Sequence, residues 1–264
     1  MSKYETFAAL HDDFLILPNA WDAGTARLMQ HAGAKAIATS SAAVAWTHGY
    51  ADGEAMPPEL ALQTVRAIAG AVDLPVSADI EAGYGDDPNV AGERAVQVLD
   101  AGAVGINIED GAAAPDLLAA KIEAVKKAAG RKGAQIWVNA RTDVYLRKQA
   151  SGDEALKETL RRSALYRDAG ADSIFVPAVI DAESLRLITS TVKLPVNALA
   201  WPGLPDAAQL KTLGVRRLSA GSGIALATVN CAHALAKAFL ADGKSDYTTQ
   251  NTLTGGEING MMRR

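Results

Sequence analysis

The chain has 264 residues, of which 49% are hydrophobic and 21% are charged, and its formal net charge is -4 at pH 7. This length accommodates one large α/β barrel as readily as two domains. The mildly acidic charge is spread without long runs, which argues against nucleic acid or an anionic membrane as a partner. The single cysteine, Cys231, excludes an internal disulfide and a cysteine-based zinc site.

The first residues, MSKYETFAALHDDFLILP, show no long apolar stretch after a basic segment. Nowhere in the chain do about 18 uncharged apolar residues run together, as a membrane-spanning helix requires. We therefore expect a cytoplasmic, enzyme-like protein that has no membrane partner.

Eight short apolar runs rich in β-formers recur along the chain and are predicted to be strands. Stretches rich in Ala, Leu, Lys and Glu lie between them and show helical spacing, as in residues 115–130 and 153–170. The predicted strands cover residues 14–20, 34–40, 74–80, 104–110, 135–141, 173–179, 194–200 and 215–221.

The even-numbered strands share a lead-in, seen as HAGAKAI, DAGAVGI, DAGADSI and, more loosely, TLGVRRL, with a glycine suited to ending a helix. Two odd-numbered strands begin with LPV instead, so the repeated unit is a pair of βα elements. This pattern predicts a (β/α)8 TIM barrel, with an open doubly wound sheet as the alternative. We expect residues 1–242 to form one barrel domain and residues 243–264 to be a tail that packs on the barrel or on a neighbouring subunit.

Acidic side chains follow two neighbouring strands, at the carboxyl ends where such barrels carry out their chemistry. Asp79 and Glu81, in SADIEAGYGD, are predicted to share one face of a strand, and Glu109 ends the next strand. Three close negative charges demand a cation, most naturally Mg²⁺ and alternatively Mn²⁺. A salt-bridge network with Arg141 is the other interpretation. The remaining polar residues near strand ends are Asn19, Asp22, Ser40, Ser41, Asp110, Asn139, Asn197, Ser219 and Ser222.

Arg141 carries a planar guanidinium that suits a substrate carboxylate, and pairing with Glu109 or Glu81 is compatible with that role. Ser40 and Ser41 offer hydroxyl and backbone N–H donors to an anionic oxygen, although serines at such positions are also common helix caps.

The segment AWTHGYADGEAMPP after the second strand is too long for a minimal turn and is typical of a substrate loop. Within it, Asp52 and His48 are candidates for proton transfer, although either could be a solvated loop residue, and for His48 that interpretation is preferred. Asp22 is expected to cap the first barrel helix. The short motif SAGSG after the last strand is a weak candidate phosphate site, which would suit a phosphosugar enzyme.

The segments SADIEAGYGD, GINIEDG, VNARTD and LPNAWDAGTARLMQHAGAKAIATSSAAVA resemble the isocitrate lyase/phosphoenolpyruvate mutase superfamily, from about Leu15 to the last helix. The resemblance implies a (β/α)8 barrel whose eighth helix is exchanged between subunits of a dimer within a tetramer. It assigns Mg²⁺ to Asp79, Glu81 and Glu109. The other expected site residues are catalytic Asp52, Arg141 and Ser40, and substrate-binding Ser40, Ser41, Arg141, Asn197 and Tyr84.

Three departures from the superfamily pattern narrow the range of expected activities. Lyases that act on isocitrate or methylisocitrate carry a Lys-Lys/Arg-Cys-Gly-His loop after the fourth strand, whereas here IEDG is followed by AAAPDLLAAK. The lysine- and asparagine-bearing gating loop of the mutase and phosphonopyruvate hydrolase branch is also missing. The sixth strand lacks the histidine found in some members.

These observations predict a Mg²⁺-dependent lyase or hydrolase that cleaves a C–C bond of a small 2-oxo acid through an enolate, as an oxaloacetate decarboxylase does. One alternative is an enzyme that acts on the C–P bond of phosphonopyruvate or on phosphoenolpyruvate. The other is a non-catalytic barrel that binds 2-oxo acids. A small 2-oxo acid is the expected partner, and a homo-oligomer, dimer or tetramer, is the expected assembly.

Overall fold

The computed structural model describes residues 1–246 and 252–263, and its strands form one parallel sheet in the order β1-β9-β8-β7-β6-β5-β4-β3-β2. Pro18 divides the predicted first strand in two, because proline has no N–H for the sheet. Its carbonyl still accepts from the Ala38 N–H at 3.0 Å. The strands are β1 (Leu15–Leu17), β2 (Asn19–Ala20), β3 (Ile37–Thr39), β4 (Val76–Asp79), β5 (Gly105–Glu109), β6 (Trp137–Arg141), β7 (Ser173–Val176), β8 (Val196–Leu199) and β9 (Arg217–Ser219).

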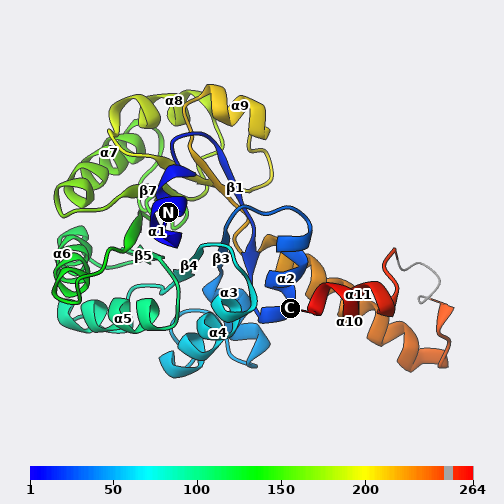
Figure 1. The fold of residues 1–264 in the computed structure, drawn as a ribbon. Helices are drawn as coiled ribbons and strands as arrows, with labels where there is room; N and C mark the ends of the chain where they lie inside the picture. The colour runs from blue at the N-terminus through cyan, green and yellow to red at the C-terminus, as the bar shows by residue number, and fades with distance from the viewer. Residues whose placement is uncertain (247–251, 264) are drawn as a thin grey trace.

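The sheet closes on itself because β1 pairs with β9 while β2, one residue further on, pairs with β3. β1 and β2 therefore act as a single first strand, and the structure confirms the predicted (β/α)8 barrel (Figure 1). The helices around it are α2 (Ala23–His31), α3 (Ser41–Thr47), α4 (Pro58–Ala71), α5 (Pro88–Asp100), α6 (Pro115–Arg131), α7 (Gly152–Asp168), α8 (Ala182–Thr191) and α9 (Ala207–Thr212).

Strand β5 shows how the barrel sorts its side chains. Ile106 and Ile108 are fully buried in the main apolar core between the strands and the helices. Asn107 and Glu109 point the opposite way, toward the barrel axis, because successive strand residues face opposite sides. The side of β5 that faces the inside of the barrel is therefore its polar side. Glu109 lies at the carboxyl end of this strand.

The amino-terminal end of the barrel is closed by helix α1 (Lys3–Ala9), which lies across it in Figure 1. Phe7 and His11 enter the barrel from this segment and pack on Trp137 of β6. The His11 and Trp137 rings stack with their centroids 4.3 Å apart, and Phe7 meets Trp137 edge-on at 6.0 Å. Aromatic packing therefore seals this end and leaves the carboxyl end as the open mouth.

Helix α10 (Gly223–Asp242) follows the last strand and extends away from the barrel (Figure 1). Among its residues, all of which the structure describes, only Ala225 is buried. By length and composition alone, α10 is the one helix of the described chain that could cross a membrane. Its large exposed apolar side chains are Ile224, Leu226, Val229, Leu235, Phe239 and Leu240.

The last described segment turns back toward the barrel as helix α11 (Gly255–Met262). Arg27 of α2 donates hydrogen bonds to the carbonyls of Met261, at 3.2 Å, and Arg263, at 2.7 Å. This part of the predicted tail therefore contacts the outside of the barrel, while residues 247–251 and 264 lie outside the described chain.

Candidate active site

A polar pocket of about 170 Å³ opens at the carboxyl ends of the strands. It contains both acidic and basic groups, the combination that binds and transforms small anions. The lining residues are Asn19, Ser40, Ser41, Ala42, Asp52, Asp79, Asn107, Arg141, Leu146, Phe175, Pro177, Leu199, Trp201, Ser219, Gly221 and Ser222.

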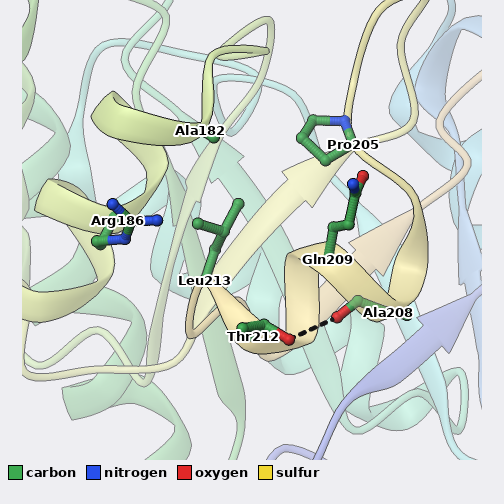
Figure 2. A pocket seen from close by; sticks show the side chains of 7 residues that line it. All are labelled: Ala182, Arg186, Pro205, Ala208, Gln209, Thr212 and Leu213. Carbon is green, nitrogen blue, oxygen red and sulfur yellow. Dashed lines mark hydrogen bonds between the residues drawn. The ribbon is translucent and has the colours of Figure 1, made fainter.

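A larger hollow of about 430 Å³ lies on the outside of the barrel between α8 and α9 (Figure 2). Arg186 is the one charged residue among those that line this hollow. The Thr212 hydroxyl donates a hydrogen bond to the Ala208 carbonyl at 3.0 Å. Ala182, Pro205, Gln209 and Leu213 also line the hollow. This hollow has no cluster of convergent polar groups, so the mouth of the barrel is the better candidate despite its smaller volume.

Asp79 ends β4 inside the mouth, and its carboxylate is held by two backbone N–H groups. Ser41 donates to Oδ2 at 3.0 Å, and Glu81 donates to Oδ1 at 3.3 Å. The Asp79 N–H in turn donates to the Thr39 hydroxyl at 2.8 Å. The start of α3 and the turn after β4 therefore fix this carboxylate at the pocket wall.

Glu81 reaches the same region by a different route from the predicted one. Strand β4 stops at Asp79, and Glu81 has a φ of 53°, so strand alternation does not place the two acids on one face. A turn closed by the Gly83 N–H and the Ile80 carbonyl, at 2.9 Å, brings Glu81 round instead. Its side chain accepts from the Glu54 N–H at 2.5 Å. Burial, together with Asp79, raises the pKa of Glu81 to about 7.

Glu109 and Arg141 are register partners at the ends of β5 and β6, and their side chains form an ion pair at 2.5 Å. Arg141 also binds Asp143 at 2.6 Å, and its guanidinium lies 6.0 Å from the centre of the Phe175 ring. Burial raises the pKa of Glu109, and the Arg141 charge opposes this rise. Because Arg141 stays cationic, the pair favours an ionised Glu109, and the nearby Asp79 works in the opposite direction.

The predicted salt-bridge network therefore forms for Glu109 alone among the three acids. Within the described chain, neither Asp79 nor Glu81 has a Lys or Arg partner, and backbone N–H groups hold both instead. In residues 1–246 and 252–263, no three His, Cys, Asp or Glu side chains already stand at metal-site spacing. The donor set nevertheless fits a hard divalent cation, because all its atoms are oxygens and burial penalises the uncompensated charge.

The two predicted serines lie at the pocket and serve local structure. The Ser40 hydroxyl caps α3 by accepting from the Ala43 N–H at 3.5 Å, and the Ser41 N–H is committed to Asp79. Asp52 enters the pocket from the long loop after α3. Burial, together with the Asp79 charge, raises the pKa of the Asp52 carboxyl. Such a carboxyl group can hold a proton closer to neutral pH than an exposed aspartate.

Two of the predicted substrate contacts lie outside the pocket lining. Asn197 is 0% exposed and accepts a hydrogen bond from the Ser219 hydroxyl at 3.1 Å, below the pocket floor. Tyr84 donates its N–H to Glu54 at 2.8 Å, and its ring faces Arg94 at 5.6 Å. Neither residue therefore contacts the pocket directly.

The two remaining candidates have local roles. His48 is exposed and contacts the Thr64 hydroxyl at 2.8 Å, away from the pocket. Asp22 caps α2 as predicted, accepting from the Thr25 N–H at 2.7 Å.

The SAGSG segment lines the pocket, but its polar groups are largely used within the protein. The Gly221 N–H donates to the Asn19 side chain at 2.9 Å, and the Ser219 hydroxyl donates to Asn197. These donors are therefore occupied by internal partners, which weakens the interpretation as a phosphate site.

Several lining residues were not predicted. Asn107 precedes Glu109 by two positions, so strand alternation would have placed it on the same inner face. Leu146, Phe175, Leu199 and Trp201 form an apolar side of the pocket and carry no motif that distinguishes them from core residues.

Residues 7–240 match the family model described as phosphoenolpyruvate phosphomutase. The chain is 38% identical over 211 residues to an uncharacterized protein of Mycobacterium tuberculosis (strain ATCC 25618 / H37Rv), covering 78% of this chain and 77% of that protein. It is also 38% identical to the crystal structure of a "putative phosphonomutase" from Burkholderia cenocepacia J2315. That comparison has a TM-score of 0.84 and covers 89% of this chain and 97% of the other.

Relatives with named activities are more distant. The 2-methylisocitrate lyase of Halalkalibacterium halodurans is 30% identical over 197 residues, which are 70% of this chain and 62% of the lyase. The oxaloacetate decarboxylase of Pseudomonas fluorescens (strain SBW25) is 30% identical over 182 residues, which are 65% of this chain and 61% of the decarboxylase. The chain therefore belongs to the phosphoenolpyruvate phosphomutase family, within the isocitrate lyase/phosphoenolpyruvate mutase superfamily.

Proposed function

We propose that this protein is a Mg²⁺-dependent lyase or hydrolase that cleaves a C–C bond of a small 2-oxo acid such as oxaloacetate. The observation that carries the proposal is that one pocket brings the carboxylates of Asp52 and Asp79 together with the guanidinium of Arg141, which is also paired with Glu109. The similarity to an oxaloacetate decarboxylase supports the choice of substrate class.

Binding begins with the substrate carboxylate, for which Arg141 is the cationic residue in the pocket lining. Asp143 and Glu109 hold its guanidinium from two directions, so little side-chain entropy is lost when the substrate arrives. Phe175 and Leu199 form an apolar wall that excludes water from the other side of a small ligand. This wall would strengthen the electrostatic interactions in the pocket.

Cleavage of oxaloacetate breaks the bond between C3 and C4 and releases CO₂. The electron pair of that bond moves into the 2-oxo group, giving the enolate of pyruvate, which takes up one proton at C3. Asp52 is the group we assign to that proton, because it lines the pocket and its raised pKa allows it to carry one.

Asp79, Glu81 and Glu109 are the residues that would hold Mg²⁺ or Mn²⁺. A divalent cation there would supply Lewis-acid stabilisation of negative charge on the 2-oxo oxygen. The backbone N–H groups of Ser41 and Glu81 keep Asp79 directed toward that position.

The test is oxaloacetate turnover by the purified protein, followed as pyruvate formation with and without EDTA. We expect turnover that EDTA abolishes and that added Mg²⁺ restores. Turnover that EDTA leaves unchanged contradicts the cation role. Tight binding of 2-oxo acids with no product from any of them would instead support the non-catalytic barrel.

A second candidate is the C–P bond chemistry of phosphonopyruvate or phosphoenolpyruvate, which the family model and the related "putative phosphonomutase" favour. The same pocket would take the same 2-oxo acid end, so the two candidates differ only in the leaving group. Phosphorus NMR of phosphonopyruvate incubated with the protein distinguishes them, because only C–P chemistry changes the resonance.

We further propose that the protein is a cytoplasmic homo-oligomer, dimer or tetramer, in which a second copy covers α10, as an exchanged eighth helix would be. The apolar side chains along α10, such as Leu226 and Val229, are about half exposed in the single chain. Burying such a surface in a partner subunit removes it from water. Light scattering should give a mass at least twice that of the chain, and Leu226→Glu should lower it, whereas a monomeric wild type contradicts the proposal.

A further inference from the structure

A continuous chain of hydrogen bonds crosses the inside of the barrel beneath the pocket. Trp137 donates to Ser173 at 2.9 Å, and Ser173 donates to Asn139 at 2.7 Å. Asn139 donates to Asn107 at 2.8 Å. Arg217 of β9 completes the chain by donating to the same Asn107 oxygen at 3.2 Å, and so links the closed end of the barrel to the pocket floor.

Arg217 is the unusual member of this chain, because it is 0% exposed and has no ion-pair partner among the described residues. Its Nε donates to Ser219 at 3.0 Å, while its Nη1 has no partner within the described chain. The neighbouring Asn197, its register partner on β8, has an unpartnered Nδ2 as well. Burial lowers the pKa of Arg217 to about 9, which still leaves it charged at neutral pH.

A buried charge with no counterion costs stability, so it calls for an explanation beyond the fold. Removing Arg217 would leave its two acceptors satisfied. Asn107 keeps its hydrogen bond from Asn139, and Ser219 still donates to Asn197. The hydrogen bonds of Arg217 are therefore not needed to satisfy Asn107 or Ser219.

Both acceptors of Arg217 also line the pocket. Asn107 and Ser219 belong to its floor, so the guanidinium lies directly beneath the space that a ligand would fill. Asp79 is the charged pocket residue that influences Arg217 most, and it carries the opposite sign. A charge in this position acts through a low-dielectric layer only one side chain thick.

We infer that Arg217 is a positioning residue whose fixed positive charge beneath the floor makes the pocket prefer doubly charged anions over singly charged ones. The inference rests on the proposed function and deepens it, since the favoured ligands are then dicarboxylates. The charge offsets the negative charge of Asp79 at the mouth of the pocket.

The experiment measures binding of oxalate, a dianion, and of oxamate, its singly charged analogue, by calorimetry in excess Mg²⁺. We expect Arg217→Met to weaken oxalate binding about tenfold or more, the effect of one unit charge several ångströms away inside a protein. Oxamate binding should weaken less, so the ratio of the two affinities falls. A purely structural role would weaken both equally.

Asn197→Asp provides a second variant that retains Arg217. It places a carboxylate on the register partner of Arg217, where it would neutralise the charge while the hydrogen bonds from Arg217 to Asn107 and Ser219 remain. We expect the same fall in the ratio of oxalate to oxamate affinity. An unchanged ratio in either folded variant overturns the inference.

The melting temperature gives an independent readout. Arg217→Met should leave it unchanged or raise it, because an unpaired buried charge is removed. The matched control is Arg162→Met, since Arg162 is a buried arginine paired with Asp110 at 2.9 Å and Glu158 at 2.6 Å. That variant should melt lower, and a comparable drop in Arg217→Met would contradict the inference.

The outcomes also separate this inference from the proposed reaction. Oxalate binding by the wild type without turnover of any 2-oxo acid refutes the reaction alone. Turnover together with an unchanged affinity ratio in Arg217→Met refutes the role of Arg217 alone. Failure of the wild type to bind either anion refutes both.

Discussion

The two ends of the barrel are formed by the same strands but differ in how they are filled. At the amino-terminal end, Phe7, His11 and Trp137 fill the opening with stacked and edge-on rings. At the carboxyl end, Asp79 and Arg141 stand around an open pocket. One end is sealed by apolar contact, and the other concentrates charge that the protein only partly neutralises.

Burial shifts an ionisable group away from its charged form at each end. It lowers the pKa of His11 to about 3, so this imidazole is neutral and belongs to the packed plug. It helps to raise the pKa of Glu81 to about 7, which leaves an acid poised to exchange its proton for a cation. Perturbed pKa values alone therefore do not identify the active end of the barrel, whereas charge that is not neutralised beside a pocket does.

The largest expected effect is on stability and belongs to the closed end. Phe7→Ala should lower the free energy of unfolding by about 3–5 kcal/mol, because it empties a fully buried aromatic site. Urea unfolding measures this loss. Affinity for oxalate should stay unchanged in the folded fraction. A large loss of affinity would contradict the idea that the closed end contributes to stability and not to ligand binding.

Asp79→Ala should have the next largest effect, and it belongs to the open end. We expect a loss of about 10² to 10³ in kcat/KM for oxaloacetate, comparable to removing one preorganised electrostatic group from an active site. Steady-state kinetics in saturating Mg²⁺ provide the measurement.

The matched control is Asp100→Asn at the exposed end of α5, where the carboxylate pairs with Lys132 at 2.7 Å. It should leave kcat/KM within a factor of about two, since exposed ion pairs contribute little. Equal losses in the two variants would show that Asp79 has no special role in catalysis.

Arg141→Met removes the proposed carboxylate clamp. Loss of a charged hydrogen-bonding partner should cost about 1.5–3 kcal/mol of binding, seen as a rise in KM of about tenfold to a hundredfold. A fall in kcat at constant KM would instead assign Arg141 to the transition state rather than to substrate capture.

The smallest expected effect is the contribution of His11 to the loss of folding stability at acidic pH. The pKa of His11 is lowered from 6.5 to about 3 in the folded protein, so between these pH values the unfolded chain binds a proton that the folded chain does not. Stability is therefore fully present above pH 6.5 and is lost as the pH falls, by about 1.4 kcal/mol per pH unit from this group. Urea unfolding at pH 7 and pH 5 should show a smaller difference for His11→Gln than for the wild type, and equal differences contradict this origin.

The sequence predicted the barrel well, because its strands and helix-ending glycines repeat along the chain. The placement of Asp79, Glu109 and Arg141 followed from the barrel rule alone. Glu81 was assigned to the right region for the wrong reason, since its left-handed backbone is a property of the turn and not of strand alternation.

Other features depended on contacts that no local pattern encodes. Arg217 follows a second arginine, Arg216, and only the closed barrel shows that Arg217 is the one bonded to Asn107 and Ser219. Asn197 ends up below the floor because its strand meets β9 at that level. The exposure of α10 could not be predicted either. An apolar sequence predicts the helix, but it does not show whether the helix packs inside the protein or projects from it.

The most direct test of the central claim is whether a divalent cation and a 2-oxo acid analogue bind together at the acid cluster. Oxalate titrated into metal-free protein, with and without Mg²⁺, should bind only when Mg²⁺ is present, and Asp79→Ala should abolish that binding. Equal oxalate affinity in EDTA and in Mg²⁺ would contradict the account, because the acids at the mouth would then serve some purpose other than holding a cation for the substrate.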